Sequence, residues 1–160
     1  MKAIVYTQYG SPDVLHFAEV NKPSKKENEV LVKVHAASIN AADLRLLNCD
    51  PFLLRLTGVG VTKPRNQILG ADVAGHVEAV GRGVVQFHPG DEVFGDIFRH
   101  GSGSFAEYIS VPECVLVQKP KNVTYKEAAA VPVAAVTALQ GLRDGGQIRP
   151  GQKVLINGAS

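Results

Sequence analysis

The side chains best able to do chemistry are histidines, carboxylates and cysteines, and their spacing decides whether they can share a ligand. His76 and Glu78 stand two residues apart in a segment that reads as a strand. Both side chains then point from one face and could meet a third ligand at a metal ion. The alternative for such a pair is a solvated sheet face. The other histidines show no ligand spacing: His16, His35, His88 and His100.

Two further segments carry candidate groups. Cys49, beside an aspartate, is either a reactive thiol or a buried, incidental cysteine. The segment 50–63, DPFLLRLTGVGVTK, is apolar and fits neither a helical nor a strand period. Such a loop packs under a domain or lines a cleft. We assign Phe52, Leu53 and Arg55 to a substrate cleft, with a packing role as the alternative.

A helix is predicted over 40–48, NAADLRLLN, directly after a strand. Asn40 is suited to the N-cap because its side-chain oxygen can accept a free backbone N–H of the first turn. Asp43 lies near the positive end of the helix, where a carboxylate is stabilising. We therefore expect Asp43 to order the helix start rather than to take part in chemistry.

The elements that must position these groups are mostly short strands. Segment 29–37, EVLVKVHAA, alternates, so that Val30, Val32 and Val34 share one face of a half-buried strand. Gly and Pro punctuate the first two thirds of the chain, which favours a β-barrel or sandwich whose glycines bend the sheet. The other strands are expected at residues 2–7, 14–20, 68–81, 91–95, 105–111 and 114–118.

The last forty or so residues change character. Thr124 and Glu127 have the spacing of a capping box, which predicts a short helix. Pro132 suits the first turn of a second helix, closed by a Gly pair in which a left-handed residue is expected at its end. Residues 152–158, QKVLING, then read as a buried strand that leads into a turn of small residues.

Composition excludes several classes of function. The net charge is only +2 and the basic residues are scattered, so no stripe is present that would grip nucleic acid. Two cysteines, Cys49 and Cys114, are too few for a disulfide framework, which favours a reducing cytoplasm. The N-terminus lacks a signal-peptide or transit-peptide pattern, and no run approaches the ~20 apolar residues of a membrane span. We expect a cytoplasmic protein with neither membrane nor nucleic-acid partners.

A collinear series of motifs covers essentially the whole chain: EVLVKVHAASINAADLR, LGADVAGHVEAVG, FHPGDEVFG, GSFAEYISVP, AAAVPVAAVTALQGL and GQKVLINGAS. This series resembles the medium-chain dehydrogenase/reductase superfamily, in particular its zinc-lacking quinone oxidoreductase branch. The resemblance implies a mainly β, α+β architecture. A GroES-like, partly open β-barrel at 1–120 would form the catalytic domain, followed by a helical connection at 121–151. Residues 152–160 would be the truncated start of a Rossmann NAD(P)-binding domain, since members are about twice this length.

Zinc-dependent relatives share this scaffold, and the resemblance places their ligands at identifiable positions. Asn40 and Ala41 stand where the zinc-dependent members carry a Cys-His pair, and Ala71 and Asp72 stand where those members carry His-Glu. An amide and a methyl group cannot replace thiolate and imidazole donors. The segment 95–105 also lacks the run of cysteines of a structural zinc lobe. We therefore expect no metal.

The resemblance also implies roles for single residues. Asn40 would hydrogen-bond near the nicotinamide ribose or the substrate oxygen, with a plain N-cap as the alternative. Thr137 matches a position that faces the nicotinamide in relatives; the alternative is a helix threonine bonded to its own backbone. Tyr125 is a candidate proton donor near the cleft. Gly158 and Ala159 would begin the phosphate-binding turn of NADPH or NADH.

The chemistry implied is hydride transfer to an activated acceptor. Without a Lewis-acidic ion a simple alcohol is a poor substrate, whereas a quinone or an α,β-unsaturated carbonyl accepts hydride with its charge spread onto oxygen. We predict a zinc-independent NAD(P)H oxidoreductase, homodimeric at full length and inactive as these 160 residues alone. Two alternatives stay open: a zinc-type alcohol dehydrogenase with displaced ligands, and a non-enzymatic GroES-like binding module.

Overall fold

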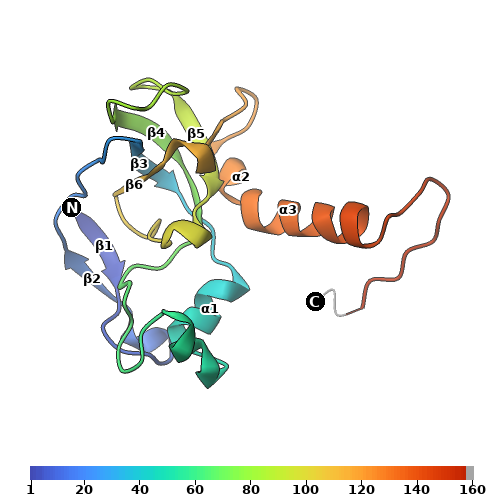
Figure 1. Cartoon of the computed structure of the whole chain (residues 1–160), viewed down its shortest axis with the longest axis horizontal. Helices are drawn as coiled ribbons and strands as arrows, with labels where there is room; N and C mark the ends of the chain where they lie inside the picture. The colour runs from blue at the N-terminus through green and yellow to red at the C-terminus, as the bar shows by residue number, and fades with distance from the viewer. Residues whose placement is uncertain (158–160) are drawn as a thin grey trace.

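The computed structural model describes residues 1–157, and its architecture is an antiparallel sheet with short helices along one side (Figure 1). Five strands form the main sheet in the order β6-β3-β4-β5-β7, and β1 pairs with β2 in a separate two-stranded sheet. An isolated bridge between Ala3 and Ala106 joins β1 to the segment before β6. The strands are β1 (Lys2–Val5), β2 (His16–Glu19), β3 (Glu29–Ala36), β4 (Asp72–Val80), β5 (Glu92–Asp96), β6 (Tyr108–Pro112) and β7 (Val117–Gln118). The mixed, mostly β architecture with open sheets confirms the predicted fold class.

The core lies on the inner face of the main sheet, where alternating valines from several strands meet. Val30 and Val32 of β3, Val73 of β4 and Val93 of β5 are fully buried. Burying a Val side chain contributes roughly 1.5–3 kcal/mol relative to exposure, which is why this strand-dense half is the stable part of the molecule. The β3–β4 register shifts between Leu31 and Val32, so strict alternation is broken and Leu31 is buried as well.

Helix α1 (Ala41–Asn48) is tied to the sheet by a buried carboxylate. Asp43 is 3% exposed. Its Oδ2 accepts the backbone N–H of Asn40 at 2.8 Å and its Oδ1 accepts the N–H of Gly70 at 3.0 Å. Burial raises the pKa of this carboxyl, while the two backbone donors act in the opposite sense. The expectation that Asp43 orders the helix start is confirmed.

Two helices follow β7. The short helix α2 (Tyr125–Ala129) begins with the predicted capping box: the Thr124 hydroxyl accepts from the Glu127 N–H at 3.3 Å, and the Glu127 carboxylate accepts the Thr124 N–H at 2.8 Å. Ala128 and Ala129 pack against Ala74 of β4. Helix α3 (Pro132–Leu139) then projects away from the sheet (Figure 1).

The end of the helical segment differs from the sequence expectation. A wider turn, η5 (Gln140–Gly145), continues α3. The left-handed residue that follows is Gln147, with φ +46°, whereas Gly146 has φ −79°. The helix therefore ends one residue later than the Gly pair suggested, on a side chain that tolerates this conformation at some cost.

The strand expected at 152–158 is not formed in the part of it that the structure describes. Residues 152–156 have no regular structure, and Leu155 is 93% exposed. A strand needs neighbours to pair its backbone groups and cover its side chains, and no described strand lies beside this segment. Gly158 and Ala159, predicted for the cofactor turn, lie outside the described residues.

Short single-turn helices fill the remaining connections. They are η1 (Pro12–Val14), η2 (Phe52–Thr57), η3 (Phe98–His100) and η4 (Glu113–Val115). The loop of uncertain structure at 50–63 thus contains a six-residue helical segment, and the first two residues of the strand expected at 114–118 belong to η4. No helix within residues 1–157 is long and apolar enough to cross a membrane.

Candidate functional site

The centre of the candidate site is Asp72, a fully buried carboxylate at the start of β4. Its Oδ2 accepts from the Ser38 hydroxyl at 2.6 Å and from the Asn40 side-chain amide at 3.0 Å. Its Oδ1 accepts the backbone N–H of Val133, in the first turn of α3, at 3.0 Å. One carboxylate therefore joins the loop before α1 to the beginning of α3. A buried carboxylate is tolerated when hydrogen-bond donors of this kind surround it.

This network fixes what Asn40 can offer to a ligand. A carboxylate only accepts hydrogen bonds, so the NH₂ group of Asn40 must face Asp72. That nitrogen also donates to the Ser38 Oγ at 3.2 Å, so both of its hydrogens are used. The carbonyl oxygen of Asn40, which also takes part in the capping box of α1, is left as the side-chain group that could accept from a ligand. Asn40 is thus suited to accept from a hydroxyl, such as that of a ribose, rather than to donate to a substrate oxygen.

The N-cap role predicted for Asn40 agrees with the structure. Asn40 stands at the N-cap position of α1 with extended backbone and forms a capping box with Asp43. Its NH₂ group is directed to Asp72 and Ser38, while the Asp43 carboxylate accepts the backbone N–H of Asn40. The predicted contact of Asn40 with cofactor or substrate stays a prediction.

Thr137 lies on α3, four residues after Val133. Side chains four apart share a helix face, so Thr137 follows one turn beyond the backbone N–H that is held by Asp72. Thr137 is exposed. Its predicted role at the nicotinamide stays a prediction, since no contact of its side chain tests it.

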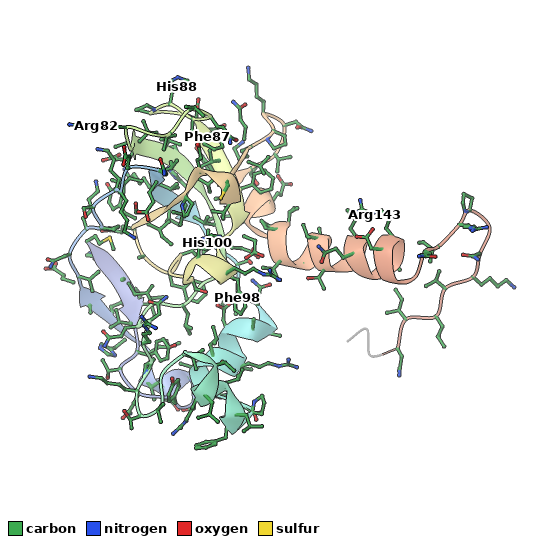
Figure 2. All side chains as sticks on the ribbon, viewed as in Figure 1. Arg82, Phe87, His88, Phe98, His100 and Arg143 are labelled. Carbon is green, nitrogen blue, oxygen red and sulfur yellow. The ribbon has the colours of Figure 1, made fainter. Side chains whose placement is uncertain are left out.

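The main cavity of about 670 Å³ lies beside α1, within the usual size range of small-molecule sites. Its wall is mostly apolar, with contributions from α1, η2, the segment before β4, and η3. Phe98 of η3 lies between the sheet and α1 (Figure 2). The lining residues are Tyr6, Leu46, Leu54, Thr57, Gly58, Val59, Arg65, Asn66, Ile68, Leu69, Phe98, Gly101 and Ser102.

The three predicted substrate residues belong to the right segment but do not line this cavity. Phe52 and Leu53 are 67% and 68% exposed. The Arg55 guanidinium carbon lies 4.9 Å from the centre of the Tyr9 ring and 4.7 Å from that of Phe52. The turn of η2 instead directs Leu54 into the cavity. Which residues of this turn contact substrate stays a prediction.

Tyr125 takes part in a polar cluster on the outer side of the sheet. Its ring stacks on His35, with centres 4.5 Å apart and planes 10° from parallel. Burial, and then its hydrogen bond to the Glu92 carboxylate, raise the pKa of Tyr125 to about 12. Tyr125 does not line the main cavity. Its predicted role as a proton donor therefore gains no support from this placement.

His76 and Glu78 of β4, the pair considered as metal ligands, bind two different side chains instead. Glu78 forms an ion pair with Lys22 at 3.0 Å. His76 Nδ1 lies 2.8 Å from Nε2 of His35, so one hydrogen bond joins the two rings. Within residues 1–157 no group of three His, Cys, Asp or Glu side chains is placed to hold a metal ion. Cys49 is buried.

Sequence reasoning missed Tyr6 and Arg65 of the cavity, and it considered Asp72 only as a zinc position. Tyr6 lies in an ordinary strand end and Arg65 in a loop, so neither has a motif. A signal for Asp72 was present: an acidic residue inside the apolar run ILGADVAG has to be paired when that run is buried.

Comparison with known proteins agrees with this architecture. The sequence model of the alcohol dehydrogenase GroES-like domain matches residues 26–121. The 2-methylene-furan-3-one reductase of Solanum lycopersicum is 40% identical to this chain, over 100% of the chain and 41% of the relative. The quinone oxidoreductase of Sus scrofa is 35% identical, over 100% of the chain and 46% of the relative. The chain thus spans less than half the length of these curated relatives.

Solved structures give the same result. The quinone oxidoreductase from Coxiella burnetii superimposes with a TM-score of 0.84 and 32% identity, covering 94% of this chain and 46% of that one. An NAD-dependent alcohol dehydrogenase gives a TM-score of 0.82 and 34% identity, covering 94% and 49%. The chain therefore belongs to the medium-chain dehydrogenase/reductase superfamily, in its quinone oxidoreductase branch, with a GroES-like domain at residues 26–121.

Proposed function

We propose that this chain is the acceptor-binding part of an NAD(P)H-dependent oxidoreductase that reduces quinones or α,β-unsaturated carbonyls by hydride transfer. Relatives named as a quinone oxidoreductase and as an NADPH-dependent alkenal/one oxidoreductase support this acceptor class. The observation that carries the proposal is the Asp72 network, which fixes Asn40 and the start of α3 together. The apolar cavity beside α1 then receives the acceptor.

The residues present fit a nicotinamide cofactor at this place. The carbonyl oxygen of Asn40 has a second lone pair that can accept from a ribose hydroxyl, and Thr137 lies on the helix that shares the Asp72 anchor. The cofactor, when bound, supplies the hydride. The chain orients the ribose through Asn40, and the apolar wall of the cavity excludes water from the acceptor. Gly158 and Ala159 belong to this proposal as the start of the phosphate-binding turn.

The same network favours a reaction that does not use a resident zinc ion. The Asp72 carboxylate already accepts three hydrogen bonds, and Asn40 is a neutral amide whose nitrogen is occupied. Neither is free to act as a zinc ligand, and Ala71 has no donor atom. Electrons therefore go to an acceptor that can itself spread negative charge onto oxygen.

Several features of the whole protein belong to this proposal as well. We propose a catalytic domain at 1–120, a helical connection at 121–151 and a cofactor domain that begins at 152–160. A homodimeric, cytoplasmic enzyme without nucleic-acid or membrane partners is the form we expect. The 160 residues alone should neither bind NADPH tightly nor turn over.

The test uses the protein encoded by the complete reading frame, with menadione as acceptor and the loss of NADPH absorbance as readout. Asn40→Ala should raise the KM for NADPH about tenfold, the loss of roughly one hydrogen bond. Asn40→Asp keeps an acceptor oxygen but places a second carboxylate beside Asp72, so it should be at least as impaired. Failure to reduce menadione or any enone, or one tightly held zinc per chain, would contradict the proposal.

A further inference from the structure

The wall of the main cavity carries a single ionised side chain. Of the residues that line it, all are apolar or neutral except Arg65. Arg65 is exposed, and none of the ion pairs among residues 1–157 involves it. Its backbone is held in place by a 2.7 Å hydrogen bond from its N–H to the Val59 carbonyl, so the residue stays at the cavity. An apolar cavity with one unpaired cation favours an apolar ligand that carries a negative charge.

A second arginine stands close in sequence to a cavity residue. Arg99 and His100 stand in the same short helix as Phe98, which lines the cavity. The Asp96 carboxylate, at the end of β5, accepts the backbone N–H of Phe98 at 2.8 Å. Figure 2 shows His100 and Phe98 on the side of the molecule that faces α1. Arg65 and Arg99 thus place two positive side chains on this side of the cavity.

A second polar group lies deeper in the cavity. Tyr6 lines it, yet the residue is only 4% exposed and packs with Leu47 and Leu69. Burial, reinforced by Tyr9, Cys49 and Asp43, raises the pKa of Tyr6 to about 12. The phenol therefore stays protonated at neutral pH. A neutral hydroxyl in an apolar wall is a hydrogen-bond donor for a ligand oxygen.

We propose that the acceptor taken by this cavity is an apolar, conjugated molecule that carries an anionic group, a carboxylate or sulfonate, bound by Arg65. Tyr6 donates a hydrogen bond to an oxygen of the ligand deeper in the cavity. This inference rests on the proposed function, in that it names the class of acceptor. It makes Arg65 the residue that selects charged over neutral acceptors.

The test compares two probes that share one apolar body and differ in charge: naphthoate and naphthamide. Their binding to the 160-residue chain is followed by naphthyl fluorescence at low ionic strength. Naphthoate should bind about tenfold more tightly, as expected for a charge-assisted contact, and added salt should reduce the preference. Arg65→Gln should bring the two affinities together. Tyr6→Phe should weaken both probes by a similar factor, about threefold.

Arg82→Gln is the matched control, because Arg82 does not line the cavity and lies on the opposite side of the sheet domain from Phe98 in Figure 2. It should leave the preference unchanged. Circular dichroism and thermal unfolding of each variant verify that the fold is intact. Equal binding of the two probes, no binding of either, or a preference that survives in Arg65→Gln would each overturn the inference.

The inference and the proposed function can fail separately. In the complete protein, naphthoquinone sulfonate and naphthoquinone are compared as acceptors with NADPH. If both are reduced equally well by the wild type and by Arg65→Gln, the function stands and the charge selection fails. If neither is reduced while naphthoate still binds through Arg65, the site stands and the oxidoreductase proposal fails.

Discussion

Replacing Asp72 by asparagine tests the network on which the site depends. The carboxylate accepts three hydrogen bonds while fully buried. A hydrogen bond to a charged group contributes about 1.5–3 kcal/mol, and an asparagine keeps only one acceptor oxygen. In either orientation its NH₂ group would face a donor, the NH₂ of Asn40 or the backbone N–H of Val133. Part of the loss is recovered when hydroxyl and amide groups rotate, which leaves a cost of about 3 kcal/mol.

The measurement is the thermal unfolding of the 160-residue chain. For a chain of this length 1 kcal/mol corresponds to a change in Tm of roughly 2–4 °C, so Asp72→Asn should lower Tm by roughly 6–12 °C. Ser38→Ala removes one of the three donors and should cost about 1 kcal/mol.

The control is Asp13→Asn, because Asp13 is exposed and accepts only from the Ser11 hydroxyl at 2.9 Å. It should change the free energy of unfolding by less than about 0.5 kcal/mol. A Tm of Asp72→Asn equal to that of the control would refute the reasoning, since a buried carboxylate with these partners would then contribute nothing.

Three further predictions concern stability. Gly70→Ala should lower the free energy of unfolding by more than about 2 kcal/mol, because a Cβ there would lie 2.1 Å from a neighbouring serine Oγ. Gly58 has a similar positive φ but open space around it, so Gly58→Ala should cost only about 1 kcal/mol. Equal costs of the two substitutions in urea unfolding would contradict this. Thr124→Ala should cost about 1 kcal/mol by losing the cap of α2, whereas Thr124→Ser should be nearly neutral by the same measurement. Burial, and then the charge of His76, lower the pKa of His35, so the unfolded chain binds this proton more readily than the folded one. Stability should therefore fall as pH drops below about 6.5. His35→Gln should reduce that loss in Tm measured between neutral and mildly acidic pH; an unchanged pH profile would count against it.

What could be predicted from sequence is what local pattern determines. The strand β3 and the capping box at Thr124 and Glu127 depend on neighbours two or three residues away, and both are confirmed, although the alternation of β3 is broken at Leu31. The strand at 152–158 has an equally good pattern, but it needs partner strands. Leu155 stays exposed because no described strand lies beside it.

The site was harder to predict because its contacts are distant in sequence. Asn40 meets Asp72 across 32 residues, and Asp72 meets the Val133 N–H across 61. Local reasoning could offer Asn40 the start of the nearby helix, and the family resemblance could offer it the cofactor, but neither could predict its contact with Asp72. In the loop 50–63 the hydrophobic residues were identified, but only the geometry of η2 decides that Leu54 faces the cavity.

Helix α3 is held at one end, and this sets a gradient of mobility along it. The N–H of Val133 is bonded to a buried carboxylate, while residues 134–139 are exposed. Amide hydrogens should exchange slowly in the first turn and quickly in the last, because opening free energies fall where tertiary support ends. Thr137 lies about 6 Å along the axis from the anchored amide. It therefore lies in the last turn of α3, beyond the turn that Asp72 holds, where tertiary support has ended.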